Sequence, residues 1–217
     1  MISHKYRFIC PRIGKNASST LVEYFRQFDK NLIDEGHESV LGSGFAAFLE
    51  SPFMGGQDHR GYYKFAFARN PYDRLVSAFH ENQNPASFRD IKTLVNNDKD
   101  FILQNILTDF SEFVRMSLKY PHIHWKSQHE MIHYDNKILV HYVGHVETIR
   151  DDIDQICKRV GINNKNVEIP VVRKSPQRKH YSSYYSSDLI EIVKKIYKKD
   201  LEYFKYTFEE DKNVLQP

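Results

Sequence analysis

The apolar and polar positions along the chain alternate between short apolar runs and segments with helical spacing. Apolar runs at 7–10 and 62–69 predict two strands, and a third run at 137–145 predicts another. The second run is almost continuously apolar, as expected for a central parallel strand that is covered on both faces. Between the first two runs, residues 18–28 place apolar side chains on one helical face and predict a helix.

Further helices are predicted after each of the later strands. Pro71 suits the first position of a helix, and Gly161 suits the position just after a helix ends. The segments are 71–82, 100–120 with one or two helices, 147–161 and 186–208. This alternation predicts an α/β fold, a P-loop-like three-layer sandwich with a central parallel sheet flanked by helices. We expect a single domain over residues 1–217, with a loop-rich, Gly-punctuated insertion at 35–61.

Composition narrows the functional classes. The 217 residues are 41% hydrophobic and 14% aromatic, which is enough for a packed core. The 31 Lys and Arg against 28 Asp and Glu give a net charge of +3, which is no general signal for nucleic acid. Cys10 and Cys157 lie in apolar contexts and predict buried free thiols in a reducing compartment. With no secretory signal or membrane-spanning run, we expect a cytoplasmic protein; its oligomeric state stays open.

The loop "RIGKNASST", residues 12–20, joins the first predicted strand to the first predicted helix. The first turn of a helix has free N–H groups and the positive end of the helix dipole, so it attracts anions. Gly14 allows close approach, the hydroxyl residues add donors, and Lys15 adds charge. The alternative is an ordinary strand-to-helix turn that Asn16 or Ser18 caps.

A second candidate anion site follows the strand at 62–69. Arg69 ends that strand, at the edge where open α/β sheets place ligands, and Ser77 on the next helix would face the same edge. An Arg and a Ser so placed could clamp an oxyanion. Alternatively, Arg69 pairs with Asp73 or Glu81 and Ser77 only packs. Two such turns in one sheet predict a ligand with two phosphate-like groups.

These motifs resemble those of sulfotransferases, especially the group that modifies carbohydrates. "RIGKNASST" resembles the loop for the 5′-phosphosulfate, and "FARNPYDRLVSAF" is similar to the motif for the 3′-phosphate. Weaker matches follow in "HWKSQHEMI", "YVGHVETIRDDIDQIC" and "RKHYSSYYSSDLIEIVKKIYKKDLEYFKYTF", so the resemblance runs from about Tyr6 to Phe208. It implies the donor 3′-phosphoadenosine 5′-phosphosulfate, the product 3′,5′-diphosphoadenosine, a small-molecule or saccharide acceptor, and no metal.

The resemblance also implies roles for individual residues. Lys15 would stabilise the bridging oxygen as the 5′-phosphate leaves, and Arg69 with Ser77 would hold the 3′-phosphate. The other residues of the 5′-phosphate loop would be Arg12, Gly14, Asn16, Ala17, Ser18, Ser19 and Thr20. Those that would cover the nucleotide are Arg178, Lys179 and Tyr181, with Gly144 to Glu147 running past the adenine. The alternative for the basic loop is a solvated run of charges.

An acceptor hydroxyl must also lose a proton, so we expect a His or a carboxylate close to the sulfur. In the related carbohydrate enzymes this residue often precedes the strand that ends in the Arg. By position His59 is the first candidate, followed by His37 and Glu35. The region 34–61 follows no family pattern, so the acceptor is open beyond the expectation of a saccharide hydroxyl.

Another motif suggests a zinc protease. "HEMIH", residues 129–133, matches H-E-x-x-H, in which His129 and His133 would bind zinc and Glu130 would act as the base. The residues before it do not predict a helix, and no third ligand stands at the metzincin spacing. His122 and His124 could still add nitrogen ligands.

Two further alternatives concern nucleotides. A P-loop kinase motif would need Gly at Ile9 and a hydroxyl residue at Asn16, and the sequence has neither. A non-catalytic module that binds the nucleotide without turnover is compatible with the same loops, because fold does not fix function.

Overall fold

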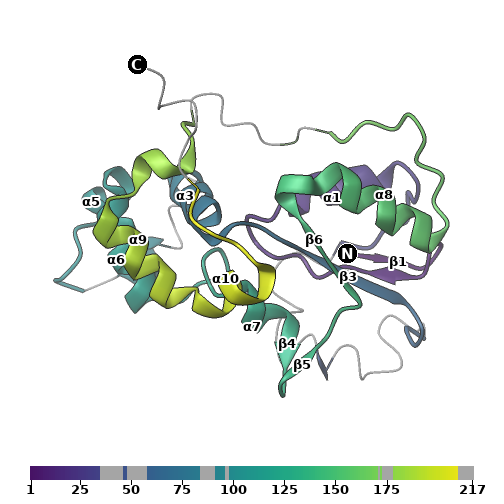
Figure 1. Ribbon diagram of the computed structural model, residues 1–217, viewed down its shortest axis with the longest axis horizontal. Helices are drawn as coiled ribbons and strands as arrows, with labels where there is room; N and C mark the ends of the chain where they lie inside the picture. Colours follow the sequence, from purple (N-terminus) through teal and green to yellow (C-terminus); the bar gives the residue numbers. More distant parts are fainter. Residues whose placement is uncertain are drawn as a thin grey trace. The chain divides into compact units, whose positions relative to one another are not determined.

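The structure is a computed structural model that describes residues 1–34, 46–47, 58–83, 91–95, 98–170, 172 and 178–209 (Figure 1). The chain divides into two compact units. Unit 1 comprises Met1–Arg69 and Gln128–Pro176, and unit 2 comprises Asn70–Ser127 and Gln177–Pro217. Each unit therefore combines two separate stretches of chain. The prediction of one domain over the whole chain stays a prediction.

Unit 1 is built on a four-stranded sheet. Its strands, in spatial order, are β1 (Ile2–Ser3), β2 (Phe8–Ile9), β3 (Tyr63–Ala68) and β6 (Tyr142–His145). β2, β3 and β6 are parallel, whereas β1 pairs antiparallel with β2 and was not predicted. β3 lies inside the sheet and its last four residues are buried, as its apolar sequence predicts. The α/β class and the mostly parallel sheet are confirmed, whereas the P-loop-like three-layer arrangement stays a prediction.

Two helices cover one face of this sheet, α1 (Ser18–Arg26) and α8 (Ile149–Val160) (Figure 1). They pack on aromatic side chains that alternate along the strands, including Phe65 and Phe67 of β3. α8 follows a 3-10 turn (η1, Val146–Thr148) and ends at Gly161, whose φ is 77°. A Gly stands there because this left-handed conformation costs other residues energy.

Both cysteines are buried free thiols in this core, as predicted. Burial raises the pKa of Cys10 to about 12 and that of Cys157 to about 11.

The strand predicted at 137–145 is two strands. β5 (Lys137–Ile138) pairs with β4 (His133–Tyr134) in a hairpin, and only the later part forms β6. The hairpin turn is Asp135-Asn136, and both residues have left-handed φ values of 49° and 57°. Two left-handed residues are what a two-residue hairpin turn requires, and Asp and Asn tolerate that conformation.

Unit 2 is helical over the residues described. Its elements are α3 (Pro71–Asn82), α5 (Leu103–Thr108), α6 (Phe110–Lys119), the 3-10 turn η2 (Tyr181–Tyr184), α9 (Ser187–Ile196) and α10 (Lys198–Phe204). α3 begins where Pro71 predicts, since the Asn70 side chain accepts a hydrogen bond from the N–H of Tyr72. Within α3, Arg74 is 1% exposed and donates to the carbonyl groups of Lys126 and Ile123.

Two further sequence-based expectations concern the whole chain. Among the residues that the structure describes, no helix has both the length and the apolar character to span a bilayer. Most of the insertion predicted at 35–61 lies outside the described residues, including the candidate bases Glu35 and His37.

Candidate functional site

The loop between β2 and α1 has an unusual backbone. Lys15 and Ala17 adopt left-handed conformations, with φ values of 70° and 55°. Such values cost non-glycine residues energy and are concentrated at functional sites. In this loop the left-handed conformation is thus adopted by Lys15 and Ala17 and not by the nearby Gly14.

The start of α1 presents N–H groups to whatever lies in front of it. The first helical hydrogen bond runs from the N–H of Leu21 to the carbonyl of Ala17, so the N–H groups of Ser18, Ser19 and Thr20 precede the ladder. No side chain caps this end and no acidic residue stands in its first turn. The alternative, a turn capped by Asn16 or Ser18, is therefore not found in the structure. A helix start without a side-chain cap or an acidic residue suits an anion.

Asn16 secures the loop to the sheet. Its side chain is 1% exposed, and its Nδ2 donates to the carbonyl of Phe67 on β3 and to Oε1 of Gln128, both at 2.6 Å. Gln128, at the start of α7 (Gln128–Ile132), is fully buried. Asn16 thus fixes the loop against the carboxyl end of β3.

Arg69 joins the second sequence motif to the first. Its Nη1 donates to the carbonyl of Lys15 at 3.0 Å, which bridges 54 residues of chain. The Gln128 side chain also accepts from the Arg69 N–H and donates to the Arg69 carbonyl, both at 2.9 Å. The structure therefore brings Lys15, Asn16 and Arg69 to one edge of the sheet, and Gln128 holds two of the three.

Arg12 has a carboxylate partner. Its Nη1 lies 2.7 and 2.8 Å from the two carboxylate oxygens of Asp34, and both side chains are largely buried. A pair of this kind ties the beginning of the loop to the chain that follows α1. A role for Arg12 toward a phosphate would require it to serve both partners.

The remaining predicted donor-binding residues belong to unit 2. Ser77 is half-buried on α3, and Arg178 forms an ion pair with Asp73 in the first turn of α3. Lys179 is exposed. Tyr181 is 7% exposed and packs in the core of unit 2, where its hydroxyl accepts a hydrogen bond from the N–H of Glu209. The alternative in which Arg69 pairs with Asp73 is not found, because Asp73 pairs with Arg178 and Arg69 donates to the Lys15 carbonyl.

His59 lies at the other end of the sheet. It precedes β3, whereas Lys15 follows β2, and these strands are parallel. A strand of six residues spans about 20 Å, so its two ends are far apart. His59 is 3% exposed and stacks on His4, with ring centroids 5.4 Å apart. This placement argues against His59 as the base, because a base must touch the acceptor close to the sulfur.

The "HEMIH" motif does not form a zincin helix. α7 ends at Ile132 and His133 begins β4, so the two histidines do not share one helix. Their rings stack in parallel with centroids 3.8 Å apart, and His133 Nδ1 lies 2.9 Å from the His129 carbonyl oxygen. Within the described ranges, no group of three His, Cys, Asp or Glu is placed to hold a metal. The geometry therefore gives no support to the protease alternative.

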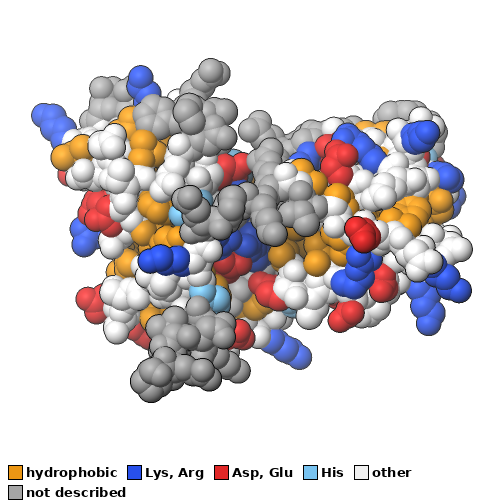
Figure 2. Space-filling view, turned by 90° about the horizontal axis from the view of Figure 1, so that it is seen from above, with side chains coloured by type: hydrophobic (Ala, Val, Ile, Leu, Met, Phe, Trp, Pro, Cys, Tyr) orange, Lys and Arg blue, Asp and Glu red, His pale blue; other side chains and the backbone are white. Residues whose placement is uncertain are grey.

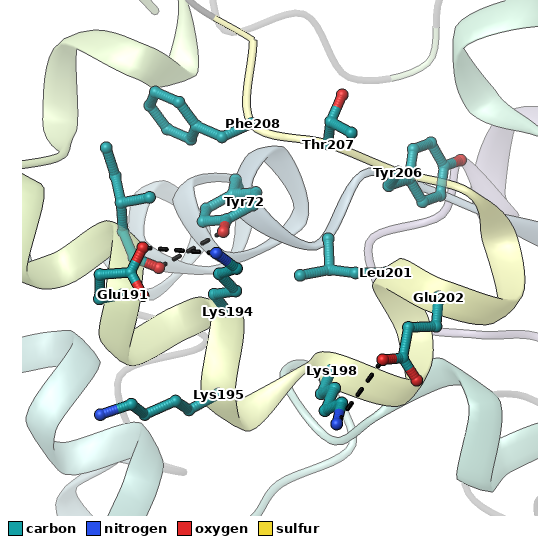
Figure 3. A pocket seen from close by; sticks show the side chains of 11 residues that line it. Tyr72, Glu191, Lys194, Lys195, Lys198, Leu201, Glu202, Tyr206, Thr207 and Phe208 are labelled. Carbon is teal, nitrogen blue, oxygen red and sulfur yellow. Dashed lines mark hydrogen bonds and ion pairs between the residues drawn. The ribbon is translucent and has the colours of Figure 1, made fainter.

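Unit 2 also has a pocket of about 510 Å³ between α3, α9, α10 and the chain that follows (Figure 3). Tyr72, Leu201 and Phe208 give it an apolar floor. Two of its lysines are paired along the helices, Lys194 with Glu191 at 3.6 Å and Lys198 with Glu202 at 3.7 Å. No predicted site residue lines this pocket.

The residue that sequence reasoning missed is Gln128. It lies inside "HWKSQHEMI", a segment that weakly matches the family, but the histidines there drew attention to metal. A single buried Gln does not change the pattern of apolar and polar positions, so the sequence gives no sign of its burial. Its importance follows only from partners 59 and 112 residues away in the chain.

The fold and the loop geometry define the class of this protein, an α/β protein in which the loop at the carboxyl edge of the parallel strands leads into an uncapped helix start. The sequence model of the Sulfotransferase family matches residues 1–207, which covers nearly the whole chain. The chain therefore belongs to the Sulfotransferase family. Searches for similar curated proteins and for similar solved structures found no significant match.

Proposed function

We propose that the protein transfers the sulfuryl group of 3′-phosphoadenosine 5′-phosphosulfate to an acceptor hydroxyl, of a carbohydrate in the first instance. Membership of the family supports sulfuryl transfer in general. The donor and the acceptor class are our inference from the two anion-binding motifs and their resemblance to the carbohydrate-modifying group.

One observation carries the choice of donor, the hydrogen bond from Arg69 to the Lys15 carbonyl. The 3′ and 5′ positions belong to a single ribose, so the sites for the two phosphates must be neighbours. Sites for two unrelated anions would not need to be neighbours, whereas Arg69 and Lys15 are in direct contact. An Arg side chain bonded to the backbone of the loop at Lys15 suits a bis-phosphorylated adenosine, whose two phosphates need neighbouring sites.

Within unit 1, each residue has a chemical task in this proposal. The N–H groups of Ser18 to Thr20 bind the 5′-phosphate, and Lys15 stabilises the charge on the bridging oxygen. Arg69 binds the 3′-phosphate. The acceptor oxygen forms its bond to sulfur as the bond from sulfur to the bridging oxygen breaks, and 3′,5′-diphosphoadenosine leaves.

The other assignments rest on the sequence. Ser77, Arg178, Lys179 and Tyr181 stay predicted donor-binding residues. The acceptor proton needs a base other than His59, and the other two candidates lie outside the described residues.

The donor assignment is tested by calorimetric titration with 3′,5′-diphosphoadenosine and, separately, with ATP. We expect the diphosphoadenosine to bind much more tightly than ATP, and Arg69→Ala to weaken it by roughly ten- to a hundredfold, the cost of losing a charged hydrogen-bond partner. Arg115→Ala, which removes an exposed arginine of α6, is the control. Equal affinity for both nucleotides would refute the donor.

Catalysis is tested by Lys15→Ala. We expect turnover on saccharide acceptors to fall by about 10²–10³, as when one preorganised donor to a developing anion is lost, with a smaller effect on donor affinity. Lys30→Ala, an exposed lysine after α1, is the control. Tight binding of the diphosphoadenosine without turnover on any acceptor would favour the non-catalytic nucleotide-binding module instead.

A further inference from the structure

Unit 1 has a second polar site, at the amino end of its parallel strands. A groove of about 780 Å³ lies there, between the β1–β2 loop, the start of β3 and the end of α8. Figure 2 shows Lys and Arg side chains gathered at the right-hand end of unit 1, where Figure 1 has the start of β3 and the end of α8. The groove is therefore separated from Lys15 and Arg69 by the length of β3.

Three cations from three different elements line this groove. They are Arg7 of the β1–β2 loop, Lys64 of β3 and Arg159 of α8. In the part of the chain that the structure describes, none of the three forms an ion pair with a carboxylate. The nearby acid, Asp58, is bonded to Arg60 through both of its oxygens. By contrast, Arg12 in the loop after β2 is paired with Asp34.

The aromatic side chains of the groove fix two of these cations. The Arg7 guanidinium lies over the ring of Tyr62 at 5.1 Å, and that of Arg159 lies over the ring of Tyr63 at 5.5 Å. Stacking of this kind positions a guanidinium without neutralising it. Both guanidinium groups therefore stay charged. Arg7 Nη2 donates one hydrogen bond within the protein, to the Arg60 carbonyl at 3.3 Å.

His141 adds a neutral donor to the groove. Its Nδ1 accepts a hydrogen bond from the Lys64 N–H at 2.9 Å, so the ring proton of the neutral tautomer is on Nε2. Its ring stacks on Tyr63, with centroids 5.6 Å apart. Burial first, and then the charges of Lys64 and Arg159, lower the pKa of His141 and favour this neutral form.

The backbone at the groove is strained as well. Arg7 is left-handed with a φ of 52°, and its carbonyl accepts from the N–H of Tyr63 at 2.8 Å. Gly61, with a φ of 79°, stands beside the Arg7 guanidinium. A non-glycine residue in this conformation persists only where the surroundings hold it, as they do at binding sites.

We propose that this groove binds a ligand carrying two or more sulfate- or phosphate-ester groups, at a site separate from the donor site. Its polar side chains offer donors and positive charge, which selects for anions. Its volume lies in the range that holds a drug-sized molecule, and the cations come from three elements, so one inorganic ion would leave most of it unused. The inference is independent of the proposed transfer reaction. A sulfated saccharide and a bis-phosphorylated nucleoside share this chemistry.

The test measures binding of sucrose octasulfate, 3′,5′-diphosphoadenosine and inorganic sulfate by calorimetry at low salt. Arg159→Gln removes an exposed cation at the end of α8, and Lys158→Gln, its exposed neighbour, is the control. We expect Arg159→Gln to weaken one polyanionic probe about tenfold, and the pair Arg159→Gln with Lys64→Gln to weaken it further. The affinity should also fall as salt rises.

The outcomes separate the sources. If Arg159→Gln weakens the binding of sucrose octasulfate alone, the ligand is a sulfated saccharide, and Lys15→Ala should leave that binding unchanged. If Arg159→Gln removes a second binding site for 3′,5′-diphosphoadenosine that Lys15→Ala retains, the ligand is a nucleotide. The proposal is overturned if no polyanion binds more tightly than inorganic sulfate, or if folded Arg159→Gln binds every probe as the Lys158→Gln control does.

Discussion

Gln128 is the residue on which the candidate site most directly depends. Its buried side chain makes one hydrogen bond to Asn16 and two to the backbone of Arg69. Gln128→Met keeps the size and flexibility of the side chain but removes all three. We therefore expect it to loosen the loop and the end of β3 together.

The size of the effect on stability follows from the buried polar groups of Asn16 and Arg69 that would lose their partner. A hydrogen bond contributes a net free energy of about 1 kcal/mol, and a buried group that loses its partner costs about 1–3 kcal/mol. Because the loop can relax, we expect Gln128→Met to lower the free energy of unfolding by about 2–4 kcal/mol. Rebuilding the strained conformations of Lys15 and Ala17 on binding would weaken 3′,5′-diphosphoadenosine by roughly tenfold, or 1.4 kcal/mol.

Urea denaturation followed by far-UV circular dichroism measures the stability, and calorimetry measures the affinity. The control is Gln155→Met, an exposed position on α8, for which a change within about 0.5 kcal/mol is expected. If Gln128→Met matched this control in both measurements, the reasoning that Gln128 holds the loop would be wrong.

The remaining predictions concern the core of unit 1. Gly144→Ala should lower the free energy of unfolding by about 1–3 kcal/mol, because its Cβ would lie 2.8 Å from the Phe67 ring and 3.0 Å from Cβ of Asp152; a urea midpoint equal to the parent's would contradict this crowding. Because burial raises the pKa values of Cys10 and Cys157 from 9.0 to about 12 and about 11, their contribution to stability is complete below pH 9 and is lost as the pH rises through 11–12. Below pH 9 both thiols should resist alkylation until urea unfolds the protein, and rapid labelling of native protein would rule this out.

Local signals in the sequence predicted the elements that carry the candidate site. The apolar run of β3 and the Asn70-Pro71 pair before α3 act over a few residues, so their consequences can be read from the sequence. The prediction of one strand at 137–145 was wrong because the start of this run pairs with β4 and its end pairs with β3, and apolar character alone does not show with which strand a residue pairs.

The site was predictable only where it depends on neighbouring residues. The loop from Gly14 to Thr20 stands out because its composition is local. The position of Gln128 depends on pairing across 59 residues, and the position of His59 depends on which edge of the sheet it joins. Strand direction relates His59 to Lys15, and the spacing between them in the sequence carries no such information.

The interleaving of the two units has a consequence for synthesis on the ribosome. Unit 1 lacks its second stretch until Gln128 and the residues after it have been made. Arg69 therefore waits for a partner that is 59 residues downstream, roughly 3–12 s at ordinary rates of translation. During that interval the nascent chain holds both predicted phosphate-binding motifs but lacks the glutamine that is hydrogen-bonded to both. The proposed nucleotide binding should thus become possible late, after more than half of the polypeptide has emerged.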